Sequence, residues 1–215
     1  MPLPAKLLDG YAHFRSGRYA SEAERYRSLG EGAQKPKIMI IACCDSRAAP
    51  ETIFDAGPGE MFVVRNVANL VPPYMPDGGH NSTSAALEFA VLSLGVQHVV
   101  VMGHGRCGGI RAAVQESSPL SHTDFIGRWM RAVKDVARIV PREKGVNEET
   151  HERHIERASI EHSLANLRTF PWIRMRENRK ELSLHGVWFD IAMGELHAYD
   201  EAEARWGAVG AGETA

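Results

Sequence analysis

Residues 37–47 read KIMIIACCDSR, in which a short apolar run leads directly into a polar motif. Residues 97–109 read QHVVVMGHGRCGG and repeat this arrangement. Apolar runs of this length are typical of strands buried in a parallel sheet. Because ligands of open α/β sheets bind beyond the carboxyl ends of the strands, we expect the two motifs to form one site from two loops.

Three side chains in these motifs, Cys43, His104 and Cys107, could bind one metal ion. Two thiolates and an imidazole are ligands that suit Zn²⁺. Three protein ligands leave one coordination position open, as a catalytic zinc site requires. The chain has three cysteines, which excludes a structural site made of four. Cys44 points away from Cys43 on an extended chain, and its role stays open.

Asp45 and Arg47 follow Cys43 closely enough to form a pair beside the metal. A guanidinium matches a carboxylate with two parallel hydrogen bonds, and it favours the ionised form of the acid. An ionised carboxylate can only accept hydrogen bonds, so Asp45 could orient a group at the open metal position. We therefore predict that Asp45 and Arg47 are catalytic residues.

The length of 215 residues suits one α/β domain with a substantial core. We interpret 1–215 as a single domain with a helical arm at 1–30 and a flexible tail at 207–215. Alternating strands and helices predict a mostly parallel central sheet flanked by helices, with a C-terminal antiparallel edge strand. The expected strands are 37–43, 61–65, 97–103, 183–190 and 195–199; the expected helices are 5–29, 80–94, 108–117, 122–139 and 148–169.

Charge and composition argue against a nucleic acid partner, a membrane span and secretion. The net charge of −2 gives no reason to expect a nucleic acid partner. We find no apolar run of about eighteen residues, so no membrane span is expected. The N-terminus lacks the apolar core of a secretory signal, and three cysteines make a poor disulfide framework. We therefore expect a cytoplasmic protein.

The pattern Cys-x-Asp-Ser-Arg followed by His-x-x-Cys-Gly-Gly resembles the β-class carbonic anhydrases. The resemblance covers roughly residues 30 to 200. Three further segments resemble the same family: FVVRNVAN at 62–69, SAALEFA at 84–90 and LHGVWFD at 184–190. This resemblance implies one zinc ion per chain and the reversible hydration of carbon dioxide to bicarbonate and a proton. It also implies a homodimer or tetramer, in which the N-terminal arm embraces a neighbouring subunit.

The resemblance further implies which residues meet the substrate: Gln34, Phe62, Val67, Phe89 and the backbone of Gly108. Position 89 is commonly tyrosine in the family, so Phe89 is a departure that removes one hydroxyl. Gln34 resembles the permanently open subgroup. The gated subgroup has a tryptophan where this chain has Ile40, and its aspartate can bind the zinc. Asp45 is thus expected to bind the metal only if the site closes.

Three other functions can be compared with carbon dioxide hydration. Carbonyl sulfide or carbon disulfide hydrolysis uses the same zinc in related proteins, and the sequence does not separate it from carbon dioxide hydration. A non-enzymatic zinc or thiol sensor would use Cys43, Cys44 and Cys107. It would not need Asp45, Arg47 or Gln34, so their presence counts against it. A nucleotide-binding module is discounted, because no glycine-rich phosphate loop follows the first strand.

Overall fold

The computed structural model describes residues 3–77, 79–115 and 125–210. The chain divides into two compact units, 1–35 and 36–215, so the boundary lies slightly beyond the predicted end of the arm at 30. The first unit holds α1 (Ala5–Ser16) and α2 (Arg18–Glu31). The helix expected over 5–29 is thus broken at Gly17, whose φ of −100° and ψ of −97° are not helical.

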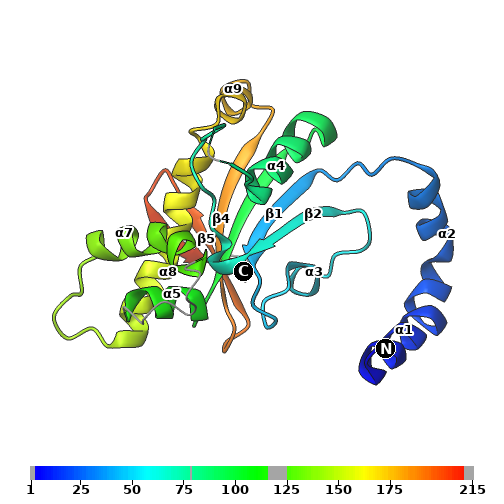
Figure 1. The fold of residues 1–215 in the computed structure, drawn as a ribbon, viewed down its shortest axis with the longest axis horizontal. Helices are drawn as coiled ribbons and strands as arrows, with labels where there is room; N and C mark the ends of the chain where they lie inside the picture. The colour runs from blue at the N-terminus through cyan, green and yellow to red at the C-terminus, as the bar shows by residue number, and fades with distance from the viewer. Residues whose placement is uncertain (1–2, 78, 116–124, 211–215) are drawn as a thin grey trace. The chain divides into compact units, whose positions relative to one another are not determined.

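The second unit is built on a six-stranded sheet in the order β2-β1-β3-β4-β5-β6 (Figure 1). The first four strands in this order pair in parallel, and β5 and β6 pair antiparallel. This confirms the predicted α/β class with its parallel core. The strands are β1 (Ile38–Cys43), β2 (Met61–Asn66), β3 (His98–His104), β4 (Ser183–Asp190), β5 (Glu195–Asp200) and β6 (Arg205–Ala208).

Both faces of β1, an interior strand of the sheet, are buried, which explains its unbroken apolar sequence. Met39 and Ile41 belong to the main hydrophobic core on one face of the sheet. Ile40 and Ala42 point to the other face, where Ile53 of α3 (Pro50–Ile53) packs nearby. The strand therefore holds its carboxyl end, and the polar motif after it, rigidly in place.

Helices α4 (Ser82–Glu88), α8 (Glu148–Leu167) and α9 (Pro171–Asn178) cover the main-core face. Their contacts with the sheet come from apolar side chains at helical spacing, such as Ile160 and Leu164 of α8. Helices α5 (Gly108–Val114) and α7 (Arg131–Ile139) join α8 around a second cluster that contains Cys43 and Cys107. The metal motif thus lies at the junction of the sheet and three helices.

The observed helices differ from the predicted ones in several places, although the end of the helix predicted over 80–94 is confirmed. The helix over 80–94 becomes α4 and a π-helical turn at Phe89–Leu94, and it ends at Gly95 with a left-handed φ of 68°. The helix over 122–139 becomes α6 (Phe125–Trp129) and α7, and its residues 122–124 lie outside the described chain. α5 ends at Val114, and residues 116–117 are not described. α9 was not predicted.

The C-terminal end of the sheet also differs from the prediction. The sequence predicts one antiparallel edge strand, whereas β6 adds a second and becomes the edge. Residues 207 and 208 therefore lie in a paired strand and not in a flexible tail. The predicted tail residues 211–215 lie outside the described part of the chain.

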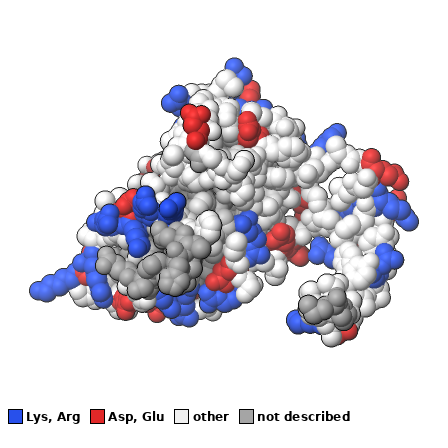
Figure 2. Space-filling model, viewed as in Figure 1, with Lys and Arg blue, Asp and Glu red and all other residues white. Residues whose placement is uncertain are grey.

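The face of the molecule shown in Figure 2 has both basic and acidic side chains. Lys and Arg side chains gather on the part of this face that holds α7, and uncharged residues make up much of the face between the charged groups (Figure 2). No helix within the described ranges is both long and apolar enough to cross a bilayer.

Candidate metal centre

The carboxyl ends of β1 and β3 lie at the same edge of the sheet. The two strands pair in parallel with Ala42 opposite Met102, so Cys43 and His104 end their strands side by side. The loop after β3 turns at Arg106, whose φ of 56° lies in the left-handed region. It then places Cys107 immediately before the first turn of α5.

The structure brings the three predicted metal ligands into one buried cluster. One ligand atom from each of Cys43, His104 and Cys107 lies within 4.8 Å of the other two. The residues are 6%, 1% and 3% exposed, respectively. Buried imidazole and thiol groups are costly unless they have partners, and a metal ion would satisfy all three at once.

His104 presents a free ring nitrogen to this cluster. Its Nδ1 lies 3.0 Å from the carbonyl oxygen of Gly105, and because a carbonyl can only accept, Nδ1 carries the proton. Nε2 then carries a lone pair, and it is a buried atom without a hydrogen-bond partner among the described residues. An imidazole oriented in this way is typical of a metal ligand, so the residues fit a zinc ion.

The two thiols alter each other's acidity. A hydrogen bond with Cys107 is the main cause that lowers the pKa of Cys43, helped by His104 and opposed by burial. The same hydrogen bond and burial raise the pKa of Cys107. One sulfur of the pair therefore readily becomes a thiolate, which is the form that binds a metal.

Arg47 holds Asp45 by both carboxylate oxygens. Its Nε donates to Oδ1 at 2.9 Å and its Nη2 donates to Oδ2 at 2.7 Å. These bonds, together with the backbone amide of Arg47, hold the pKa of Asp45 well below its usual range. Oδ2 lies 3.9 Å from His104 Nε2, so this ionised pair stands directly beside the metal-ligand cluster.

Arg65 supports the loop and was not among the predicted site residues. Its guanidinium donates to the carbonyl oxygens of Cys43 at 2.8 Å and Asp45 at 2.6 Å. The amide of Cys44 donates to the carbonyl of Asn66 at 2.9 Å, which extends the pairing of β1 and β2 by one residue. Cys44 itself is exposed. Residues of β2 thus hold the backbone of the Cys43–Asp45 motif in place through these hydrogen bonds.

Three carboxylates of α8 that were not among the predicted site residues contact this region: two bind the metal loop, residues 105–107, and the third binds α5. Glu149 pairs with Arg106 at 2.9 Å, and Glu152 pairs with Arg111 at 3.2 Å. Glu156 accepts the Cys107 backbone N–H at 3.0 Å. The spacing of three and four residues along the helix, which puts these acids on one face, was the available signal.

Glu156, which contacts the metal loop through the Cys107 backbone, is a buried acid that is 4% exposed. Burial raises the pKa of its carboxyl group, while hydrogen bonds from the Cys107 amide and the Trp188 indole act in the opposite direction. The indole Nε1 donates to its second oxygen at 3.0 Å. Both oxygens of this buried acid are therefore satisfied.

The predicted substrate residues fall into three places. Val67 lies near the start of α5, because a Cβ on Gly109 would be 3.0 Å from Val67 Cγ1; Gly108 is the first residue of that helix. Phe62 packs against Phe89 with the rings tilted by 40° and their centroids 5.9 Å apart. Gln34 is exposed and belongs to the first unit, so the second unit does not include it.

The Phe62–Phe89 pair lies away from the metal-ligand cluster within one chain. Phe62 lies opposite Met39, whereas Cys43 lies opposite Asn66 at the other end of β2. Four strand residues correspond to about 13 Å. The register therefore separates this pair from the metal-ligand cluster of its own chain, although both residues were predicted to meet the substrate.

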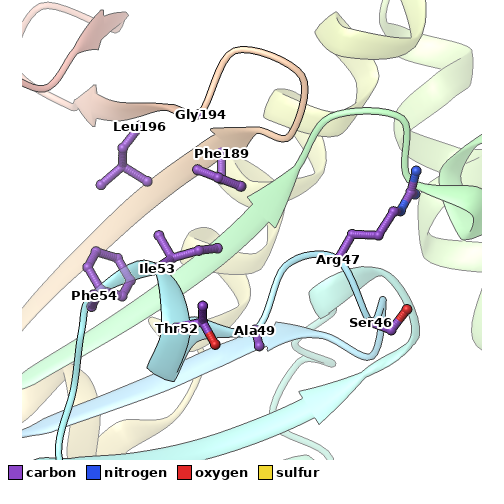
Figure 3. A pocket seen from close by; sticks show the side chains of 9 residues that line it. All are labelled: Ser46, Arg47, Ala49, Thr52, Ile53, Phe54, Phe189, Gly194 and Leu196. Atoms are coloured by element: carbon purple, nitrogen blue, oxygen red, sulfur yellow. The ribbon is translucent and has the colours of Figure 1, made fainter.

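A pocket of about 490 Å³ opens beside Arg47. Its hydroxyl groups come from Ser46 and Thr52, and its apolar side chains come from α3, β4 and β5 (Figure 3). The apolar lining consists of Ala49, Ile53, Phe54, Phe189 and Leu196, with Gly194 at the turn. The metal ligands do not line this pocket, which extends from the arginine toward the sheet.

Comparison with known proteins agrees with this geometry. The family model described as carbonic anhydrase matches residues 38–196. Beta carbonic anhydrase 3 of Arabidopsis thaliana is 31% identical over 198 residues, which cover 91% of this chain and 76% of that protein. The chain belongs to the β-carbonic anhydrase family. The resemblance in the sequence motifs is thereby confirmed.

Other relatives differ in how much of their length this chain covers. The carbonic anhydrase of Pseudomonas aeruginosa is 34% identical, with 93% of this chain and 89% of that protein covered. Beta carbonic anhydrase 5, chloroplastic, of Arabidopsis thaliana is 39% identical, with 83% of this chain covered. The chain spans 58% of that relative and 65% of beta carbonic anhydrase 6, mitochondrial, from the same plant.

Solved β-carbonic anhydrase structures share the fold. The β-carbonic anhydrase CcaA superposes with a TM-score of 0.87 at 31% identity, covering 94% of this chain and 90% of that chain. A β-carbonic anhydrase from Sordaria macrospora gives a TM-score of 0.77 at 28% identity, with 95% of each chain covered.

Proposed function

We propose that this protein catalyses the zinc-dependent, reversible hydration of carbon dioxide to bicarbonate and a proton. The observation that carries the proposal is the buried cluster of Cys43, His104 and Cys107 with an ionised carboxylate 3.9 Å from His104 Nε2. The relatives named carbonic anhydrases support the same reaction.

One zinc ion per chain would be held by Cys43, His104 and Cys107. The soft sulfur ligands and the buried imidazole favour zinc over hard cations, which prefer oxygen ligands. Zinc in a site with an open position lowers the pKa of a bound water toward about 7. The chain's own contribution is to hold the ligands in a buried, prearranged cluster.

Asp45 would orient the reacting group, and Arg47 would orient Asp45. An ionised carboxylate accepts a hydrogen bond and thereby fixes the direction of the donor. Arg47 occupies both Asp45 oxygens, which favours a site that stays open. We infer that Asp45 binds the metal only when this pair is broken.

The backbone N–H of Gly108 would hold a substrate oxygen, because the first amides of a helix lack intrahelical partners. Gln34 would orient a substrate oxygen through its side-chain amide. Phe62, Val67 and Phe89 would provide apolar walls for an uncharged substrate. Because the strand register separates Phe62 and Phe89 from the metal ligands of their own chain, we infer that they serve the site of a second copy.

A homodimer or tetramer would supply that second copy. The N-terminal arm leaves large apolar side chains in solvent, and the β-carbonic anhydrases from Sordaria macrospora are described as tetrameric. The exposed side chains are Leu3, Leu7, Leu8 and Tyr11. Light scattering of the active protein should show at least two copies, and an active monomer would contradict this.

The compartment remains a prediction. We expect the cytoplasm, where thiols stay reduced. Named relatives include chloroplastic and mitochondrial proteins of Arabidopsis thaliana.

Zinc content and carbon dioxide hydration, measured on one preparation, test the proposed function. We expect one zinc per chain and rapid hydration, and Asp45→Asn should keep the zinc and lose most of the activity. Parallel assays with carbonyl sulfide and carbon disulfide distinguish the related hydrolases. Zinc without any of these activities would instead favour a sensor.

A further inference from the structure

Glu156 connects the metal loop to the centre of the sheet. The residue is 4% exposed, and each of its carboxyl oxygens accepts one hydrogen bond. Oε1 accepts the backbone N–H of Cys107, and Oε2 accepts the indole N–H of Trp188, both at 3.0 Å. Glu156 therefore bridges a metal-ligand residue and a strand of the sheet.

We propose that Glu156 is a positioning residue of the metal centre, which fixes the backbone of Cys107 and thereby the direction of its thiol. The inference rests on the proposed zinc site and deepens it. Glu156 contacts the ligand through the backbone N–H of Cys107. It acts on the metal through Cys107, as outer partners of metal ligands generally do.

Trp188 gives Glu156 a rigid anchor. The indole is 1% exposed, and its Cζ2 would lie 3.0 Å from a Cβ on Gly105, so it packs directly under the metal loop. The guanidinium of Arg157 lies 4.7 Å from the centroid of the indole ring. Because Glu156 is held by Trp188 of β4, its hydrogen bond to Cys107 fixes the backbone of Cys107 relative to the sheet.

A glutamine at position 156 would keep the size of the side chain but not both contacts. Its single carbonyl oxygen can accept from one of the two N–H donors, and its NH₂ group would face the other. An unsatisfied buried donor is costly, so either the Cys107 backbone or the indole must move. The substitution therefore tests the bridge with almost no change in volume.

Glu152 offers a matched control on the same helix. It is also 4% exposed, and its carboxylate binds the side chain of Arg111 rather than a metal ligand. Glu152→Gln makes the same chemical change one turn away. Any general effect of losing a buried acid from α8 should appear in both variants.

The experiment first measures zinc content and carbon dioxide hydration of the wild-type protein. It then measures zinc affinity by competition with a chelator and the thiolate-to-metal absorption of the cobalt-substituted protein. We expect Glu156→Gln to bind zinc ~10–100-fold more weakly and to shift the cobalt spectrum. Glu152→Gln should stay within about threefold of wild type, well below that effect.

The outcomes separate the two proposals. A wild-type protein that binds no zinc overturns the proposed metal site. A wild-type protein that binds zinc, with Glu156→Gln and Glu152→Gln alike in affinity and spectrum, overturns the role of Glu156 alone. If Glu156→Gln does not fold, Glu156→Asp replaces it: the shorter acid cannot span both donors, and an unchanged cobalt spectrum would also refute the inference.

Discussion

The backbone of Gly103 passes against the side chain of Ile160, so closely that a Cβ at position 103 would lie 2.7 Å from Ile160 Cδ1. Gly103 directly precedes His104 on β3, and Ile160 lies on α8. The missing side chain of Gly103 therefore lets α8 pack closely against β3 at the residue next to the metal ligand His104.

Gly103→Ala should therefore lower the free energy of unfolding by ~1–3 kcal/mol, because the added methyl group overpacks a closed core. Ile160→Val removes the nearest atom and alone should cost ~0.5–1.5 kcal/mol. Together the two substitutions should cost less than their sum, since each relieves the other. Urea denaturation of the four proteins measures this, and strict additivity would show that the contact is not the cause.

Cys107→Ser should lower both zinc content and activity. A neutral hydroxyl is a poor replacement for a thiolate that binds zinc at about 2.3 Å. Cys44→Ser is the control, because Cys44 is exposed and lies outside the cluster. Metal analysis of purified protein decides the matter, and full zinc occupancy in Cys107→Ser would refute the assignment of this ligand.

Arg47→Ala should lower carbon dioxide hydration by ~10–100-fold while zinc remains bound, because it frees the carboxylate that Arg47 orients. Arg47→Lys should recover little, since an ammonium group lacks the planar fork. Arg138→Ala serves as a control that breaks an exposed ion pair with Asp135. Stopped-flow hydration with parallel zinc analysis tests this, and an Arg47→Ala enzyme of normal activity would contradict it.

The Arg168–Glu201 ion pair should make stability depend on pH. A hydrogen bond with Arg168 lowers the pKa of Glu201, so the pair stabilises the fold above the unfolded-state pKa. The contribution is lost as the pH falls through the folded-state pKa. Because 43% of the Glu201 side chain is exposed, solvent screening limits the gain to roughly 1 kcal/mol.

Denaturation of wild type and Glu201→Gln at neutral and acidic pH measures this contribution. The difference in unfolding free energy should be present at neutral pH and should shrink on acidification. A difference that stays constant or grows toward acidic pH would show that the pair does not act through the charge of Glu201.

The strands and the metal cluster could be predicted because their signals are local. Residues 38–42 and 99–102 are apolar without interruption, and each polar motif starts where its strand ends. Parallel pairing of β1 with β3 then brings Cys43 and His104 together without further information.

The elements that were missed depend on partners elsewhere in the chain. β6 has no alternating apolar pattern, and it forms because Trp206 packs on Tyr199 and its indole donates to Glu161 at 2.8 Å. Glu156 lies in a polar helix, where an acid ordinarily faces solvent, and its burial depends on Trp188 from β4. The distance between Phe62 and the metal-ligand cluster follows from the register of β1 and β2, which no single segment encodes.

The pairing of β1 with β3 has a kinetic consequence for metal exchange. Cys43 ends one strand and His104 ends its neighbour, so any opening event that separates these strands takes one ligand away from the other two. Both strands lie inside the sheet, with neighbours on each side, and such openings require nearly global unfolding. The exchange of bound metal with an isotope in solution should then be slow, and its rate would report how often the centre of the sheet opens.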